Sequence, residues 1–385
     1  MIHGLKHCEQ MSRRSLNLLV DGDVFCWQRN GGISRLFQRV LAEMVAVDRS
    51  LDIEVVLSGE VKTPVPDAPR VSVRHLPRIV TNRRPWRLRQ MAQRWMRPVQ
   101  RLYWHSLTCD AFMSTYYTTP PVRAPHLVVA YDMIHEKYPD LFCHCNGDET
   151  VRQKKRALEH ASSIISISKQ TQLDLDMYLG IPGERCRVVY PASGLEGISP
   201  GEVQERSPFL LYVGDFVTGY KNFERLAKTV LFSSDSLLKD LCLFVCSARE
   251  PDETCLERYD HAVTAGRLVF HHVQSDRELA GLYSRCAAFV YPSLYEGFGI
   301  PILEALQFGA PVACSMAGSI PEAGGEAVFY FDPQSEDEMA SAISKAVMSG
   351  RSHFEVVRRQ QQAARFSWRK TEMGYLEAIR AVPGC

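Results

Sequence analysis

Short apolar runs alternate with longer amphipathic stretches along the whole chain. The first series of runs covers 16–20, 53–57, 127–130, 164–167 and 187–190, and the second covers 209–213, 241–246, 268–270, 288–291 and 311–313. Runs that are apolar almost throughout are typical of parallel strands with helices on both faces of their sheet. Two such series predict an α/β protein with two doubly wound domains.

The segment 191–208 separates the two series and is rich in Gly, Ser, Pro and Glu, as linkers are. A length of 385 residues suits two domains of similar size. We therefore predict a first domain over 1–195, a linker over 196–208 and a second domain over 209–365. An amphipathic stretch over 366–385 follows, and we predict that it forms a helix that crosses back to the first domain.

The charge and cysteine content argue against several classes of protein. The 45 Lys and Arg residues nearly balance the 44 Asp and Glu residues, so a net charge of +1 predicts no nucleic-acid binding by the molecule as a whole. The 12 cysteines are scattered, and Cys143-His144-Cys145 lacks a second pair at zinc-ligand spacing, so we expect reduced structural thiols. No apolar stretch has the length of a signal peptide or a spanning helix, and we expect a cytoplasmic protein.

The most informative segment of the second series combines a strand end, a glycine turn and a helix start. Gly297 and Gly299 allow backbone amides to approach a ligand, and Pro301 suits the first position of a helix. The N-terminus of a helix attracts phosphate through its N–H groups and its dipole. We expect Glu304, in the first helical turn, to bind ribose hydroxyls, and Glu296, before the glycines, to accept hydrogen bonds from a sugar.

Glu296 and Glu304 have the spacing of a paired-glutamate motif, E-x7-E, and the segment resembles that motif in family 4 of the retaining glycosyltransferases. The resemblance continues through 275–279, 309–312, 318–322 and 331–333, which together span most of the second domain. It implies a GT-B fold, in which two Rossmann-like domains face each other across a cleft, and a nucleotide-sugar donor. Taken alone, the two glutamates would fit a loop carboxylate and a helix-start carboxylate equally well.

Lys221 is the cation that we expect on the donor diphosphate, at a helix start across the cleft from Pro301. A solvated surface lysine is the alternative. Members of the family often carry an arginine nearby as a second phosphate ligand. Here Asp215 follows Gly214 and Tyr220 precedes the lysine, so the resemblance leaves Lys221 and helix dipoles to stabilise the phosphates.

Gly31 and Gly32 lie between the first strand and an amphipathic helix, where family members carry a similar pair that reaches the donor from the first domain. The predicted donor-binding residues are Gly31, Gly32, Gly214, Lys221, Glu296, Gly297, Phe298, Gly299, Ile300 and Glu304. Asp21-Gly22-Asp23 has the letters of a metal-binding pair, but we expect it on the acceptor side. We therefore expect a metal-independent protein with no cofactor besides the nucleotide-sugar co-substrate.

The segment 131–139 follows an apolar strand, at the edge of the sheet where α/β proteins place their sites. It resembles the mannosyl- and rhamnosyltransferases of bacterial surface polysaccharides, which often have His-Asp where this chain has Tyr131-Asp132. The resemblance implies that Asp132, with His135 in place of the missing histidine, contacts the sugar or the acceptor; a structural histidine is the alternative. The predicted catalytic residues are Glu296, Lys221, His135 and Asp132.

The resemblance implies hexose transfer with retention of anomeric configuration, in which the acceptor hydroxyl attacks the face that the diphosphate leaves. Mannose from GDP-mannose is the first expectation, and UDP-hexoses and dTDP-rhamnose stay open. The expected acceptor is a glycan or a lipid-linked sugar in cell-surface polysaccharide synthesis. The alternatives are a nucleotide-sugar epimerase on the same fold and a non-catalytic relative that binds the donor, because the histidine and the arginine of the family are missing.

A basic segment over 70–104 has ten arginines and no Asp or Glu between Arg70 and Arg101, with tryptophans at Trp86, Trp95 and Trp104. Its apolar residues fall roughly on one helical face. We expect an amphipathic helix that lies on anionic lipid, which would make the protein peripheral at the inner face of the membrane. A solvated basic face and local nucleic-acid binding are the alternatives.

Overall fold

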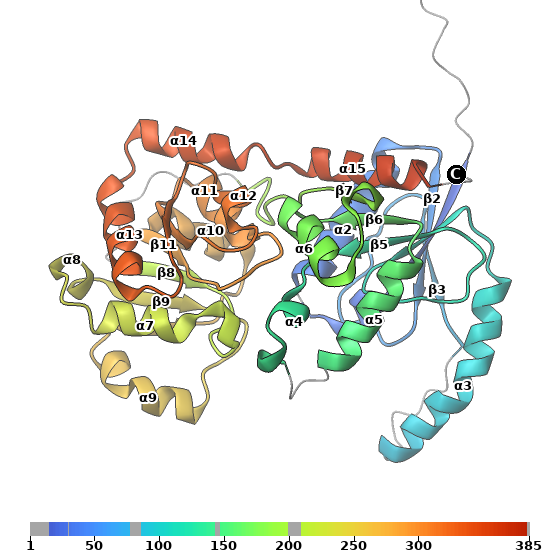
Figure 1. Cartoon of the computed structure of the whole chain (residues 1–385), viewed down its shortest axis with the longest axis horizontal. Coiled ribbons are helices and arrows are strands. Elements are labelled where there is room, and N and C mark those ends of the chain that lie inside the picture. The colour runs from blue at the N-terminus through green and yellow to red at the C-terminus, as the bar shows by residue number, and fades with distance from the viewer. Residues whose placement is uncertain (1–14, 30, 78–85, 143–146, 199–208, 383–385) are drawn as a thin grey trace, which may run out of the picture.

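A computed structural model describes residues 15–29, 31–77, 86–142, 147–198 and 209–382. The cysteine-rich segment singled out from the sequence, 143–145, lies outside these residues. The described chain forms two parallel sheets with helices interleaved between their strands (Figure 1). The predicted α/β class is confirmed.

The first domain contains a seven-stranded sheet in the order β3-β2-β1-β4-β5-β6-β7, and every neighbouring pair is parallel. Its strands are β1 Leu16–Asp21, β2 Leu51–Leu57, β3 Val71–His75, β4 Ala111–Ser114, β5 His126–Ala130, β6 Ser163–Ser166 and β7 Cys186–Val188. Its helices are α1 Asp23–Trp27, α2 Gly32–Val47, α3 Trp86–Ser106, α4 Ile134–Lys137, α5 Gly147–His160 and α6 Lys169–Leu179, with short 3-10 turns η1 Pro139–Leu141 and η2 Gly183–Arg185.

The second domain contains a six-stranded parallel sheet in the order β10-β9-β8-β11-β12-β13. Its strands are β8 Phe209–Val213, β9 Cys242–Cys246, β10 Leu268–His271, β11 Ala288–Tyr291, β12 Val312–Ser315 and β13 Phe329–Phe331. Its helical elements are η3 Gly219–Lys221, α7 Phe223–Leu231, α8 Ser236–Lys239, α9 Glu253–Thr264, α10 Asp276–Arg285, α11 Ile300–Gln307, α12 Ile320–Gly324, α13 Glu336–Ser349 and α14 His353–Ala363.

The apolar runs missed three strands, β3, β4 and β13, and misplaced the last strand of the first sheet. The expected strand 187–190 is wrong in its bounds, because β7 ends at Val188. The β3 strand lies at the edge of its sheet and exposes four of its five side chains, so it needs no apolar run. The β4 and β13 strands have only four and three residues and were not recognised as apolar runs.

The last helix, α15 Trp368–Arg380, crosses back from the second domain and lies over the first (Figure 1). It packs on α2, and Tyr375, Leu376 and Ile379 belong to the core of the first domain. The Trp368 indole donates a hydrogen bond to the Ser193 carbonyl at 3.0 Å. The amphipathic pattern of 366–385 therefore arises from burial against the first domain.

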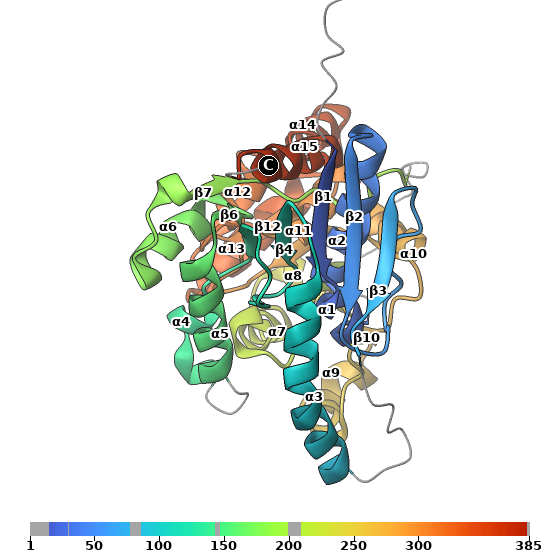
Figure 2. The same cartoon turned by 90° about the vertical axis from the view of Figure 1, so that its right-hand side faces the viewer.

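The basic segment contains both a strand and a helix. A helix was expected for the segment as a whole, but residues 71–75 form β3, and α3 begins only at Trp86. The helix projects from the first domain beyond the edge of its sheet (Figure 1, Figure 2). Three of its apolar side chains are largely exposed, with exposed fractions of 77% for Trp95, 46% for Val99 and 71% for Leu102. Within the described ranges, no helix is long and apolar enough to cross a membrane.

Candidate active site

The side chains of Lys221 and Glu296 form an ion pair of 2.7 Å, and 17% and 13% of them are exposed. Burial, the largest single influence, would lower the pKa of Lys221, but the charge and the hydrogen bond of Glu296 together with the neighbouring Tyr220 and Asp215 outweigh it and raise the pKa above its ordinary value. The lysine therefore carries a full positive charge at neutral pH. Two residues predicted to act on different parts of the donor lie in direct contact.

Lys221 was predicted to lie at the start of a helix, but in the structure it is the last residue of the turn η3. Asn222 follows it in the left-handed conformation, with φ of 57°, and α7 begins only at Phe223. The Asn222 amide donates hydrogen bonds to the carbonyls of Pro292 at 3.0 Å and Pro333 at 2.8 Å. These bonds hold the residue after Lys221 against the loop that carries Glu296, which explains how the two side chains meet.

The glycine turn after Glu296 leads directly into α11. Gly299 has φ of 110°, a conformation that favours glycine, and precedes the first helical residue, Ile300. Pro301 is thus the second residue of the helix and not the first. No side chain within the described ranges caps this N-terminus, so its first N–H groups face no side-chain acceptor, as in anion sites of this kind.

The Phe298 ring is buried against Tyr190, with ring centres 5.5 Å apart.

Glu304 does not lie in the first turn of α11, where it was expected, because the helix begins at Ile300 and Glu304 is its fifth residue; its side chain is almost fully buried. Burial raises the pKa of its carboxyl group from 4.5 to about 7, although the Tyr283 hydroxyl, which donates a hydrogen bond at 3.1 Å, lowers it. A Cβ atom at Gly194 would lie 2.9 Å from Glu304 Oε1, so this carboxyl group touches the backbone that joins the two domains.

A pocket of about 400 Å³ lies between the domains next to this contact. Its lining includes Arg35, Gln38, Thr63, Gly194, Asp276 and Trp368. Arg35 of α2 and Asp276 of α10 form an ion pair of 2.8 Å across it. Gly194 borders both the pocket and Glu304, so the pocket adjoins the second glutamate of the motif.

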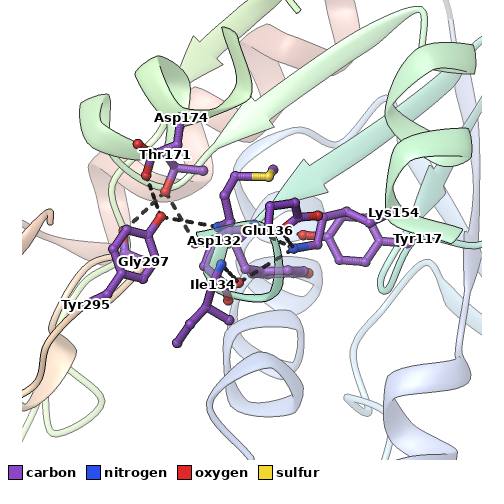
Figure 3. Close-up of polar contacts among 11 residues, drawn as sticks. Tyr117, Asp132, Ile134, Glu136, Lys154, Thr171, Asp174, Tyr295 and Gly297 are labelled. Atoms are coloured by element: carbon purple, nitrogen blue, oxygen red, sulfur yellow. Dashed lines mark hydrogen bonds and ion pairs between the residues drawn. The ribbon is translucent and has the colours of Figure 1, made fainter. Parts of the chain in front are cut away.

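The first domain contributes the loop after β5, which carries Asp132 and His135. Lys154 of α5 supports this loop, because its Nζ donates hydrogen bonds to the Asp132 carbonyl at 3.0 Å and to Glu136 Oε2 at 2.8 Å (Figure 3). Only 1% of the Lys154 side chain and 6% of the Glu136 side chain are exposed, whereas 34% of the Asp132 side chain is exposed. A buried ion pair therefore fixes the loop and leaves its first carboxylate open to solvent.

Tyr131, directly before Asp132, and His135, three residues after it, have different surroundings. Tyr131, which takes the place of the histidine in the family pattern, is buried, and its hydroxyl donates a hydrogen bond to the Thr115 carbonyl at 2.7 Å. The His135 ring packs against Phe142, with ring centres 4.3 Å apart, and its buried Nδ1 has no hydrogen-bond partner among the described residues. Burial, followed by the charge of Lys154, lowers the pKa of His135, which favours a neutral ring.

The remaining predicted donor residues lie where loops join helices or strands. Gly31 precedes α2, which begins at Gly32, and the Ser34 hydroxyl closes the turn by donating a hydrogen bond to the Gly31 carbonyl at 2.9 Å. Gly214 follows β8, and its N–H donates to the Cys246 carbonyl at 3.0 Å. The structure thus brings Glu296 and Lys221 together, whereas Gly31 and Gly32 lie on the other domain, at the start of the helix that carries Arg35.

Asp21 and Asp23 belong to the first domain, at the end of β1 and the start of α1. The Asp21 carboxylate is buried and accepts hydrogen bonds from the hydroxyls of Thr115 and Thr118, and the Ser58 hydroxyl donates to Asp23. Burial raises the pKa of both carboxyl groups, that of Asp23 to about 7. In the part of the chain that the structure describes, no three His, Cys, Asp or Glu side chains are placed to hold a metal ion.

Three residues of the site were not identified from the sequence: Lys154, Tyr283 and Tyr295. Tyr295 stands beside Glu296 in the motif, so its position was a usable signal. The other two lie on helices far from Asp132 and Glu304 in the sequence, and only the fold brings them into contact.

Residues 198–365 match the sequence model of the family described as glycosyl transferases group 1. An O-antigen chain mannosyltransferase B of Escherichia coli is 42% identical over 94 residues, which are 24% of this chain and 25% of that protein. The O-antigen chain mannosyltransferase RfbU of Salmonella typhimurium is 25% identical over 230 residues, 60% of this chain and 63% of that protein. The chain thus spans from a quarter to under two thirds of the length of these relatives.

Solved structures of glycosyltransferases share the arrangement of both domains. Sucrose-phosphate synthase from Thermosynechococcus elongatus superposes with a TM-score of 0.74 at 17% identity, covering 95% of this chain and 98% of that one. WaaG, a glycosyltransferase involved in lipopolysaccharide biosynthesis, gives a TM-score of 0.68 at 17% identity, covering 96% of this chain and 100% of that one. Over residues 198–365 the chain is therefore similar to the group 1 glycosyl transferases, and as a whole it has the GT-B fold of two facing Rossmann-like domains.

Proposed function

We propose that this protein transfers a hexose from a nucleotide-sugar to a glycan or lipid-linked acceptor, with retention of configuration and without a metal ion. The observation that carries the proposal is the ion pair of Lys221 and Glu296 beside the uncapped N-terminus of α11. A cation and free N–H groups suit a diphosphate, and a carboxylate beside them suits the hydroxyls of the attached sugar.

In this mechanism the protein positions the reactants and stabilises charge. The bond from the anomeric carbon to the diphosphate oxygen breaks, and the acceptor oxygen bonds to the same face of that carbon. The acceptor proton passes to the departing phosphate oxygen. Lys221 and the amides around Gly297 and Gly299 stabilise the negative charge of the leaving group, Glu296 holds the donor sugar, and Asp132 holds the sugar or the acceptor.

His135 and Glu304 take supporting roles. The lowered pKa of His135 suits a neutral hydrogen-bonding partner for a hydroxyl group. Glu304 accepts the ribose hydroxyls, and the adjoining pocket between α2 and α10 offers space for the nucleoside. Gly31 and Gly32 approach the donor from the first domain.

GDP-mannose is the first donor to test, because the curated relatives are named mannosyltransferases of the O-antigen chain. UDP-hexoses and dTDP-rhamnose follow, since a solved relative, Anabaena HepE, was crystallised with UDP-glucose and superposes with a TM-score of 0.66 at 16% identity, covering 95% of this chain and all of that one. The names of the relatives also support surface-polysaccharide synthesis as the setting.

The proposal includes contact between α3 and an anionic membrane surface at the cytoplasmic face. Trp95, Val99 and Leu102 are spaced as one helical face and are exposed together, while the segment 70–101 contains no acidic residue. An apolar face edged by arginines is the pattern of helices that lie in a lipid interface.

The proposal is tested by thermal stabilisation of the protein with GDP, UDP, dTDP and ADP, each with Mg²⁺ and with EDTA. We expect one nucleotide to stabilise selectively, with no effect of EDTA. The variant Lys221→Ala should lose this stabilisation, and Lys228→Ala, which removes an exposed lysine seven residues further on, should keep it.

The nucleotide identified in this way selects the donor for transfer assays. Turnover of the donor without any acceptor would favour the epimerase, and binding without transfer to any acceptor would favour the non-catalytic relative. Stabilisation by no nucleotide would contradict the donor site itself.

A further inference from the structure

Tyr295 stands directly before Glu296 and is fully buried between the two domains. Its hydroxyl donates a hydrogen bond to the Asp174 carboxylate on α6 at 2.5 Å, and it accepts one from the Met133 N–H at 3.2 Å (Figure 3). Both partners belong to the first domain, whereas Tyr295 belongs to the second. One hydroxyl group therefore connects the loop of Glu296 with the loop of Asp132.

The bond between Tyr295 and Asp174 has the features of a strong interaction. Asp174 is 2% exposed, and its other carboxylate oxygen accepts a hydrogen bond from the Gln170 amide at 2.8 Å. A hydrogen bond to a buried carboxylate is stronger than one between neutral groups. Burial raises the pKa of Tyr295 far above its ordinary value, so the hydroxyl keeps the proton that it donates.

The residue after Glu296, Gly297, also contacts the first domain. The Gly297 carbonyl accepts a hydrogen bond from the Thr171 hydroxyl at 3.4 Å, and a Cβ atom at Gly297 would lie only 2.0 Å from the Tyr131 carbonyl oxygen. The Glu296 side chain, in contrast, contacts Lys221 of its own domain. The loop thus rests on the first domain while its carboxylate contacts the second.

We propose that Tyr295 is a positioning residue, whose hydroxyl sets the separation between the Glu296 and Asp132 carboxylates by holding the two loops together. Its role rests on the proposed function, in which these carboxylates hold the donor sugar and the acceptor side. The Tyr295 hydroxyl bonds to Asp174 and Met133, which are not among the groups proposed to bind the nucleotide, so Tyr295 acts on turnover and not on affinity for the nucleotide.

The variant Tyr295→Phe keeps the ring and removes the hydroxyl. We expect kcat to fall roughly ten- to hundredfold, as the loss of a charge-assisted hydrogen bond predicts. The Kd of the nucleoside diphosphate should stay within about twofold, because its binding groups are intact. Tyr138→Phe is the matched control, since that hydroxyl makes only a 3.4 Å contact with the Leu294 carbonyl of the same loop and its loss should leave kcat nearly unchanged.

Hydrogen exchange gives a second measurement that needs no activity. The Met133 amide and the amides of 294–297 should exchange faster in Tyr295→Phe and in Asp174→Asn than in the wild type or in Tyr138→Phe. If the wild type transfers no sugar, the proposed function fails, and exchange alone decides on the connection between the loops. Unchanged exchange, unchanged kcat in an active enzyme, or equal losses of kcat and nucleotide affinity would overturn the positioning role.

Discussion

Replacement of the buried Glu304 by glutamine tests how strongly burial acts on this carboxyl group. The group has a pKa of about 7 in the folded protein, against an ordinary value of 4.5, and burial is the main cause. Because the folded pKa is raised, the stability that this group contributes is fully present below pH 4.5 and is lost as the pH rises through 7. At about 1.4 kcal/mol per pH unit, the difference corresponds to roughly 3 kcal/mol of lost stability for the ionised group.

Glutamine has nearly the same shape, can accept the hydrogen bond from the Tyr283 hydroxyl and does not ionise. The free energy of unfolding of Glu304→Gln minus that of the wild type should therefore rise by about 2 kcal/mol between pH 5 and pH 8. The rest of this change in the difference should occur below pH 5. Urea unfolding without nucleotide, followed by tryptophan fluorescence, measures this difference at each pH. A destabilisation by the substitution that does not depend on pH cancels when the differences at pH 5 and pH 8 are compared. A gap that is the same at pH 5 and pH 8 would show that Glu304 titrates normally.

Three further predictions concern the site and its supports. Glu296→Ala should lower kcat far more than Glu304→Ala, which should act mainly on donor affinity; equal effects in steady-state kinetics would refute this division. Lys154→Met should destabilise the protein by about 3 to 5 kcal/mol in urea unfolding, because it leaves the Glu136 carboxylate buried without a partner. Adding Glu136→Gln should restore part of that loss, and no recovery would contradict the reasoning. The protein should sediment with vesicles of phosphatidylglycerol but not of phosphatidylcholine, and Trp95→Ser should weaken this; sedimentation independent of anionic lipid would exclude the membrane contact.

The sequence predicted most of the fold because the central strands are buried on both faces and are apolar almost throughout. This reasoning applies to β1 and β8, and it cannot apply to β3, whose side chains mostly face solvent at the edge of the sheet. Likewise, the amphipathic pattern of the last helix predicted burial, and α15 indeed packs on the first domain. Burial was not sufficient by itself, since β4 is buried along its whole length and was nevertheless missed.

Contacts within the candidate site could be foreseen only between residues that are close in sequence. Glu296 and the glycines that follow it could be identified together, since they lie in a single loop before α11. The contact of Glu296 with Lys221 spans 75 positions and depends on η3 and Asn222, which no local pattern indicates. Lys154 was hidden for another reason: α5 is strongly polar, and only the loop folded over it shows that this lysine is buried.

The helix α15 has a consequence for how such proteins can be recombined. Its Thr371 hydroxyl donates a hydrogen bond to the Tyr190 carbonyl at 2.8 Å, and Arg380 forms an ion pair with Asp48, so the end of the chain is a part of the first domain. A chimera that takes its second domain from another transferase therefore needs two junctions, one after β7 and one before Trp368. A single crossover would leave the first domain with a foreign helix on its core.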